Sequence, residues 1–199
     1  MNELVCGIGV NDGEYRAKVD GKNTREYSLW RNMLFRCTEE GQDKNPTYTG
    51  CSISENFKYY SYFHKWCQQQ FGFSNIDESG KSWHLDKDLL IKGNKLYSED
   101  TCVFVPRKLN SMITKSDATR GEWPIGVHFN KPCGKFIACC SIGCGKIQHL
   151  GVFQEPQAAF LTYKTFKEGI VKQAAQEYKH QLDARVYEAL INYEVNEND

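Results

Sequence analysis

The sequence predicts a mixed α+β protein with two domains, and three features of its 199 residues support this fold class. Apolar side chains recur at helical spacing in the N-terminal part and again after Pro156. Short runs rich in β-branched and aromatic residues, separated by turns that contain glycine, lie between these segments. Apolar residues make up 40% of the chain and aromatic residues 13%, as expected for a folded protein with a buried core.

The N-terminal part is expected to be helical. An amphipathic helix is predicted within residues 27–37, with an apolar face formed by Trp30, Met33, Leu34 and Cys37. A second helix is predicted after Ser52, because Ser52 and Glu55 have the spacing of a capping box. Its apolar stripe consists of Phe57, Tyr60, Phe63, Trp66 and Cys67. Such a stripe packs against a neighbouring element, so these aromatic side chains are expected in the core rather than stacked on bases.

The centre of the chain has the pattern strand, loop, strand, helix. A first strand is predicted around Asp86, and a turn at Gly93 and Asn94 follows it. Residues 102–105 have strand character, and Pro106 suits the first position of a helix. This short unit brings together five polar side chains of different chemistry: His84, Asp86, Lys87, Asn94 and Asn110.

The C-terminal part predicts a small three-stranded antiparallel sheet packed on a C-terminal helix. Its strands are expected at residues 125–127, 136–141 and 148–153, with glycine-bearing turns between them. Pro156 is expected to open the long helix, and a shorter helix follows. The polar residues 114–122 are typical of a linker, so we expect one domain at residues 1–115 and another at residues 116–199.

The charge is zero overall but is unevenly distributed. Residues 107–150 carry seven basic and two acidic side chains. This segment predicts a locally basic surface that holds a polyanion, although a solvated basic face without a partner has the same composition. No run of eighteen apolar residues and no signal-peptide pattern occurs, so we expect a cytoplasmic protein without a membrane partner. The nine scattered cysteines are expected to be free thiols in a reducing compartment.

The central unit has the side chains that metal-dependent phosphodiester cleavage requires. Asp86 and Asn110 supply oxygen ligands of the kind that one Mg²⁺ or Mn²⁺ ion prefers. Cleavage also needs a base for the attacking water. Lysine is ordinarily a cation, so stabilising the transition state is the easier role for Lys87. His84 lies on the same side of the predicted strand as Asp86 and is the alternative base, or else an ordinary surface histidine.

Asn94 has two interpretations. Its side chain is expected to hydrogen-bond backbone groups and to hold the two strands at a fixed separation. The alternative is a plain Gly-Asn turn without any further role.

Residues 84–110 resemble the core of HNH endonucleases, also called ββα-metal nucleases, in the form common in phage genomes and self-splicing-intron proteins. In that family the first motif is usually Asp-His or His-His, the middle residue is Asn, and the last is Asn or His on a helix. The resemblance implies that Asp86 and Asn110 are metal ligands and that Asn94 is the structural asparagine. Lys87 occupies the general-base position, where the family has histidine.

A second resemblance covers residues 124–175. It rests on Gly126-Val127, Gly134-Lys135-Phe136, His149-Leu150-Gly151-Val152 and Tyr163. These residues are similar to the plant ethylene-response-factor (ERF) DNA-binding domain, which phage HNH proteins also carry. The resemblance implies that a three-stranded sheet lies in the major groove of double-stranded DNA. The side chains expected to face the DNA are His128, Asn130, Lys131, Lys135, Ile137, Cys139, Ser141, Lys146 and Gln148.

A structural zinc ion is an alternative for the C-terminal part. Cys133, Cys139, Cys140, Cys144 and His149 lie close together in the sequence. Paired Cys-x-x-Cys knuckles are absent, and some of these cysteines fall on predicted strands, where a small apolar residue fits. We therefore favour thiols over a Zn²⁺ site.

Two functions from different classes follow. In the first, the chain is a divalent-metal-dependent DNA endonuclease of a phage or mobile element, in the cytoplasm of the host cell. In the second, the nuclease core is catalytically degenerate, and the chain is a DNA-binding or host-interaction module that binds or inhibits a protein partner. Lys87 favours the second function, while Asp86, Asn94 and Asn110 favour the first.

Overall fold

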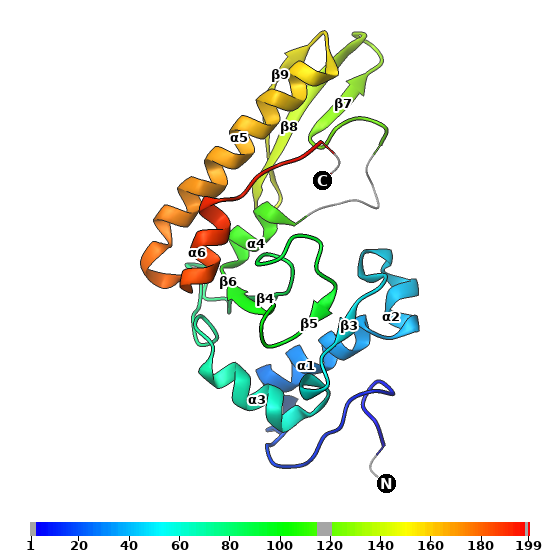
Figure 1. Cartoon of the computed structure of the whole chain (residues 1–199), viewed down its shortest axis with the longest axis vertical. Coiled ribbons are helices and arrows are strands. Elements are labelled where there is room, and N and C mark those ends of the chain that lie inside the picture. Colours follow the sequence, from blue (N-terminus) through cyan, green and yellow to red (C-terminus); the bar gives the residue numbers. More distant parts are fainter. Residues whose placement is uncertain (1–2, 115–120, 198) are drawn as a thin grey trace. The chain divides into compact units, whose positions relative to one another are not determined.

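The computed structural model describes residues 3–114, 121–197 and 199 of the chain. It contains both helices and small sheets, so the predicted mixed α+β class is confirmed (Figure 1). The chain divides into two compact units, Met1–Val105 and Pro106–Asp199. The predicted linker, residues 114–122, falls largely on residues 115–120, which lie outside the described residues.

The first unit combines short helices with three pairs of short strands. Its helices are α1 (Arg25–Arg36), α2 (Glu39–Lys44) and α3 (Tyr60–Gln69), with 3₁₀ turns at Pro46–Tyr48 and Asn56–Lys58. Its strands are β1 (Lys18–Val19), β2 (Lys22–Asn23), β3 (Ser52–Ile53), β4 (His84–Asp86), β5 (Leu96–Tyr97) and β6 (Val103–Val105). The pairs β1–β2 and β4–β6 are antiparallel, and the pair β3–β5 is parallel.

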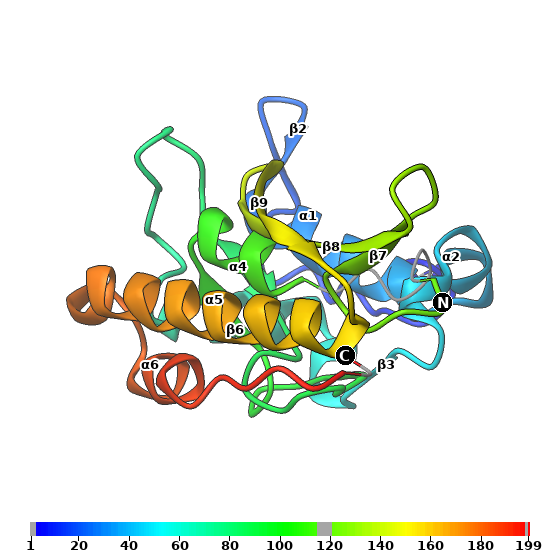
Figure 2. The same ribbon diagram turned by 90° about the horizontal axis from the view of Figure 1, so that it is seen from above.

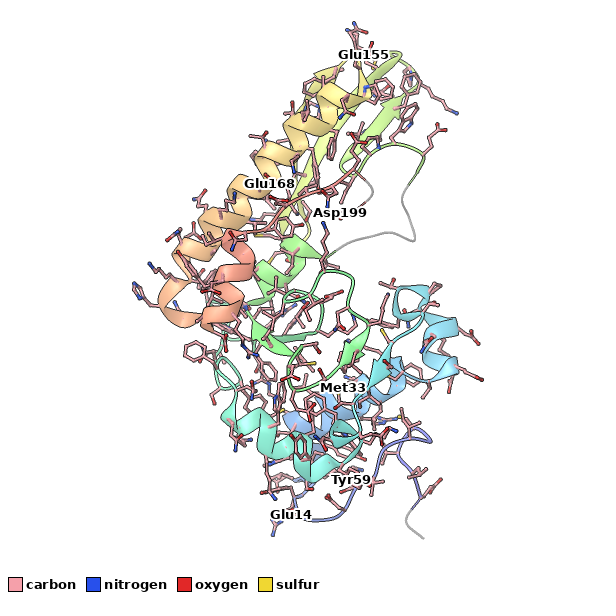
Figure 3. All side chains as sticks on the ribbon, viewed as in Figure 1. Glu14, Met33, Tyr59, Glu155, Glu168 and Asp199 are labelled. Carbon is pink, nitrogen blue, oxygen red and sulfur yellow. The ribbon has the colours of Figure 1, made fainter. Side chains whose placement is uncertain are left out.

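The core of the first unit is aromatic, as the helical stripes predict. Trp30 of α1 is fully buried, and its indole N–H donates to the carbonyl of Phe57 at 2.7 Å. Met33, labelled in Figure 3, is 1% exposed. Phe63 and Trp66 of α3 are also buried, so these aromatic side chains cannot stack on nucleic-acid bases. Burial of these side chains supplies most of the stabilisation expected for this unit.

The predicted capping box at Ser52 is wrong. Ser52 belongs to β3, where its backbone N–H donates to the carbonyl of Lys95 at 3.0 Å. Helix α3 begins at Tyr60 instead, after the 3₁₀ turn Asn56–Lys58. A strand that pairs with a segment distant in sequence has displaced a local helix signal. The first helix fits the prediction better, since α1 spans Arg25–Arg36 against the predicted residues 27–37. Thr24 caps it by accepting from the N–H of Tyr27 at 3.2 Å.

The second unit contains the predicted three-stranded antiparallel sheet. It begins with helix α4 (Arg107–Ile113), for which Pro106 is the N-cap. The sheet has the order β7–β8–β9, formed by Val127–Asn130, Lys135–Gly143 and Lys146–Phe153. Helices α5 (Pro156–Glu177) and α6 (Ala184–Ile191) follow, with a 3₁₀ turn at Lys179–Gln181 between them. Pro156 opens α5 as predicted.

Helix α5 packs along one face of the sheet (Figure 1). The buried contact is formed by Cys140 of β8 with Phe160 and Tyr163 of α5. Gly126 lies so close to the ring of Tyr163 that a Cβ atom would collide with it, and its φ of 78° also favours glycine. The sheet and α5 therefore form one small two-layer core, as the sequence predicts.

Helix α4 belongs to this second core, which explains where the units divide. The buried amine of Lys167, 4% exposed, donates to the carbonyls of Met112 and, at 3.4 Å, of Ser141. At the β8–β9 turn, the N–H of Cys144 donates to the Ser111 hydroxyl at 2.9 Å. A Cβ atom on Gly143 would lie 2.9 Å from the carbonyl oxygen of Lys108. These contacts fix α4 to the sheet, so the unit begins at Pro106.

Within the described part of the chain, no helix has the length and apolar character needed to span a membrane.

Candidate functional site

The strand pair β4–β6 places the central polar residues on a buried support. Asp86 lies opposite Val103, and His84 lies opposite Val105. All three residues of β6 are buried, and Phe104 packs edge-on against Phe73 with ring centroids 5.3 Å apart. Because β6 is held by the core, the position of Asp86 at the end of β4 is also held.

Asp86 is a partly buried carboxylate that closes a turn. One of its oxygens, Oδ1, accepts from the backbone N–H groups of Asp88 at 2.9 Å and of Leu89 at 2.7 Å. Burial, and then the negative charge of Asp88, raise the pKa of Asp86 to about 6, while the two backbone hydrogen bonds oppose this rise. A nearby cation would stabilise the charged form of such a carboxylate, and this is the electrostatic behaviour expected of a metal ligand.

Lys87 points into the interior of the first unit. It is 8% exposed, and its amine lies 3.3 Å from Asp88 Oδ2 and 5.6 Å from the ring centroid of Tyr97. Lys87 directly follows β4, and its amine lies beside Asp88 and Tyr97, whereas the Asp86 carboxylate accepts from backbone N–H groups of the turn. These contacts support a fixed, buried cation rather than a side chain that approaches solvent.

Asn94 makes the backbone contacts that the sequence predicts. Its amide Nδ2 donates to the carbonyls of Lys87 at 2.6 Å and of Leu96 at 2.7 Å, and its Oδ1 accepts from the N–H of Leu96 at 3.1 Å. The side chain thereby ties the end of β4 to the start of β5, whereas the two predicted strands, β4 and β6, are joined by their own backbone pairing. Three hydrogen bonds from one side chain to the backbone are more than a plain Gly-Asn turn needs, so they favour the interpretation of Asn94 as a structural residue.

Replacing Asn94 with alanine is expected to lower the free energy of unfolding by about 2 kcal/mol, because three backbone groups lose a partner. Urea denaturation measures this change. Gln69→Ala, an exposed position on α3, is the matched control and is expected to change stability by less than about 0.5 kcal/mol. Equal effects of the two substitutions would show that the Asn94 hydrogen bonds contribute nothing specific.

His84 and Asn110 occupy different units. His84 is exposed on β4 and shares a side of the strand with Asp86, two residues later. Asn110 is partly buried on α4, where its backbone N–H donates to the Pro106 carbonyl at 2.9 Å and its carbonyl accepts from Thr114. Asp86 therefore belongs to the first unit and Asn110 to the second.

Most of the predicted DNA-facing residues share the sheet face that α5 leaves open. Ala138 and Cys140 are fully buried and point toward α5, so the residues that alternate with them point away. The strand pairing places His128 beside Ile137 and Asn130 beside Lys135 on this open face. Cys139 and Ser141 share the face, and Lys131 lies in the turn between β7 and β8.

Lys146 and Gln148 are placed differently. Gln148 lies opposite the buried Cys140, so both Gln148 and Lys146 alternate with the open-face positions of β9. Three open-face residues are absent from the predicted set: Ile147, 74% exposed, Val152, 49% exposed, and His149. Counting alternate residues back from the apolar Leu150 places Gln148 and Lys146 on the covered side, so Ile147 and His149, which lie between these positions, belong to the open face. An irregularity in the pairing beside Ala138 and Cys139 changes the alternation before Val152, which no local signal indicates.

The cysteines of the second unit are divided between the two faces and the two ends of β8, with Cys139 on the open face and the adjacent Cys140 buried. Cys133 and Cys144 are exposed in the turns at opposite ends of β8, whereas Cys140 is buried. Cys139 lies opposite His149 across the strands. Among residues 3–114, 121–197 and 199, no group of three His, Cys, Asp or Glu side chains is arranged to hold a metal ion.

All nine cysteines are free thiols, and their reactivity is expected to follow burial. Iodoacetamide is expected to modify the exposed Cys133 and Cys144 before the buried Cys51, Cys67 and Cys102. Burial raises the pKa of Cys102 to about 12 and raises that of Cys51, which removes the reactive thiolate. Peptide mass spectrometry of the native protein measures the order, and early modification of Cys102 would contradict it.

No protein-family model, curated protein or solved structure matches this chain.

Proposed function

We propose that the chain is a divalent-metal-dependent DNA endonuclease of the ββα-metal class, which hydrolyses phosphodiester bonds. The observation that carries this proposal is the Asn94 side chain, whose three backbone hydrogen bonds fasten the loop that follows Asp86. A loop fastened at its base keeps a carboxylate at the end of a strand in a constant position, as catalysis requires. The order of strand, loop, strand and helix agrees with the same class.

The proposed cofactor is one Mg²⁺ or Mn²⁺ ion held by Asp86 of the first unit, and the resemblance to ββα-metal nucleases implies Asn110 as a further ligand. Both side chains offer hard oxygen atoms, which these ions prefer. The elevated pKa of Asp86, caused by burial and by Asp88, fits a carboxylate that a cation would stabilise. When bound, such an ion polarises the phosphate and lowers the pKa of water.

The other residues of the first unit have separate roles in this proposal. His84 accepts a proton from the attacking water, because it is exposed and shares a strand side with Asp86. Lys87, paired with Asp88 and buried, keeps the turn after β4 in place and adds positive potential. Asn94 holds the loop and makes no contact with the substrate.

The proposed DNA-binding surface is the open face of the β7–β8–β9 sheet. Its polar residues are His128, Asn130, Lys135, Ser141 and His149, and Lys131 lies at one turn. Ile137, Ile147 and Val152 add apolar area to this face. Lysines contact phosphates and position the protein, whereas histidine and asparagine side chains reach base edges. Lys146 and Gln148 alternate with the open-face positions of β9 and are not part of the proposed surface.

A specific observation favours a second candidate function, that of a catalytically degenerate DNA-binding or host-interaction module. Lys87 stands where a general base is expected, and its amine is buried against Asp88 and Tyr97. A residue in that environment does not accept a proton from water at a substrate. If His84 does not act as the base, the protein still binds its partner but does not cleave DNA.

Plasmid nicking separates the two functions. Supercoiled DNA is incubated with the protein and Mg²⁺ or Mn²⁺, and a parallel sample contains a chelator. The endonuclease function predicts relaxed or linear DNA in the metal samples alone. The degenerate module predicts intact plasmid with every divalent ion, and its DNA-binding form also predicts a retarded band in a gel-shift assay.

A further inference from the structure

A hairpin in the first unit projects from α1 and contributes nothing to the core. It comprises residues 16–24, with β1 and β2 joined by Asp20 and Gly21 (Figure 2). Both turn residues have positive φ, 48° and 75°, the combination of a type I′ turn that fits a two-residue hairpin loop. The four strand residues are all exposed, including Val19 at 52%.

The hairpin is held at its base. The N–H of Thr24 donates to the carbonyl of Ala17 at 2.9 Å, and the hydroxyl of Tyr60 donates to the carbonyl of Arg16 at 3.3 Å. Tyr60 is fully buried, so this anchor connects the hairpin to the core. An isolated two-stranded hairpin is marginally stable in water, and this one gains no buried area along its strands. Its exposed side chains are therefore available to a ligand.

The hairpin side chains are mainly cationic. Residues 16–24 contain three basic residues, Arg16, Lys18 and Lys22, and one acidic residue, Asp20. In the described part of the unit, none of the three cations forms an ion pair. By contrast, Lys44, Lys58, Lys65 and Lys87 each pair with a carboxylate. Unpaired cations on a projecting element are complementary to a polyanion.

The strand register places Lys18 and Lys22 on opposite faces of the hairpin. Lys18 lies opposite Asn23, and Val19 lies opposite Lys22. Successive cross-strand pairs point to opposite faces of a ribbon, so Lys18 and Lys22 extend from opposite faces. The major groove of B-DNA admits a two-stranded β-ribbon and has a phosphate backbone on each side. A ribbon with one lysine on each face matches that groove.

We propose that the hairpin of residues 16–24 is a second DNA-binding element, with Lys18 and Lys22 directed to the phosphates on opposite walls of a groove. This inference rests on DNA as the partner in the proposed function, but it does not depend on cleavage. Because the hairpin lies outside the sheet of the second unit, it adds phosphate contacts that the sheet does not make.

Fluorescence anisotropy with a labelled DNA duplex over a range of salt concentrations tests the inference. The variant Lys18→Gln/Lys22→Gln is expected to reduce the slope of log affinity against log salt by about 1.8, since each lost phosphate contact removes about 0.9. At about 0.1 M salt this corresponds to an affinity loss of roughly ten- to a hundredfold. The melting temperature is expected to be unchanged, because both side chains are exposed.

Two further variants make the test specific. Lys44→Gln/Lys81→Gln removes the same charge from exposed positions elsewhere in the first unit and is expected to retain the parent slope. Lys18→Arg/Lys22→Arg keeps both cations and is expected to retain the parent affinity.

The outcomes are distinguishable. An unchanged slope in Lys18→Gln/Lys22→Gln overturns the hairpin inference and leaves the proposed function standing. An equal loss in the Lys44 and Lys81 variant shows a general charge effect and also overturns it. A greater loss of affinity for single-stranded RNA than for the duplex overturns the choice of partner. If the parent protein binds no duplex at low salt, the proposed function and this inference fail together.

Discussion

Replacing Asp86 with asparagine is expected to reduce plasmid nicking by at least about a hundredfold, while it raises the free energy of unfolding near neutral pH. Asparagine is a weaker ligand for a divalent ion because it carries no charge. It retains a carbonyl oxygen, so the hydrogen bonds from the N–H groups of Asp88 and Leu89 are kept. The substitution thus removes the charge and preserves the turn.

The stability effect has a defined pH dependence. Burial and Asp88 raise the pKa of Asp86 to about 6 in the folded protein, above the value of about 3.9 for an unfolded chain. A raised carboxyl pKa means that the folded state binds the proton more tightly. The resulting stabilisation is complete below about pH 4 and is lost as the pH rises through 6, by at most about 3 kcal/mol. Asp86→Asn is expected to lack this loss.

Urea denaturation of both proteins at pH 5 and pH 8, in a chelator, measures the difference. The exposed Asp43→Asn is the control and is expected to change neither nicking nor stability. Full nicking activity in Asp86→Asn would remove Asp86 from the proposed metal site. A stability difference that is equal at both pH values would contradict the buried-charge explanation.

Replacing Arg25 with alanine is expected to lower the free energy of unfolding by about 3 to 4 kcal/mol. The guanidinium donates to the carbonyl of Phe73 and, at 2.9 Å, to the carbonyl of Trp83. It also lies over the ring of Phe73, 4.4 Å from the centroid. Arg25 therefore connects α1 with the loop before β4, and its removal leaves two carbonyls without this donor.

Arg25→Lys tests whether the planar group is required. One ammonium cannot reproduce both the forked hydrogen bonds and the stacking, so we expect most of the alanine effect. Arg31→Ala, at an exposed position of the same helix, is expected to cost less than about 0.5 kcal/mol. Thermal unfolding followed by circular dichroism compares the three variants. A lysine variant as stable as the parent would show that charge alone suffices.

The candidate site was predictable where the chemistry is local. Asn94 follows a glycine in a short loop, and its backbone hydrogen bonds join residues close in sequence. The strand and helix around Asp86 and Asn110 were also predictable, because apolar runs and Pro106 mark them. The direction of Lys87 was not, because its contact with Tyr97 depends on the position of another strand.

The sequence alone determined the mixed fold class, the three-stranded sheet with its long helix, and the polar residues around Asp86. These features depend on periodicity and on short-range signals, which are written in consecutive residues. The tertiary structure decided that Ser52 joins a parallel strand pair, that α4 packs with the sheet, and that Gln148 alternates with the open-face residues. Each of these depends on contacts between segments distant in sequence, whose free energy outweighs local propensity.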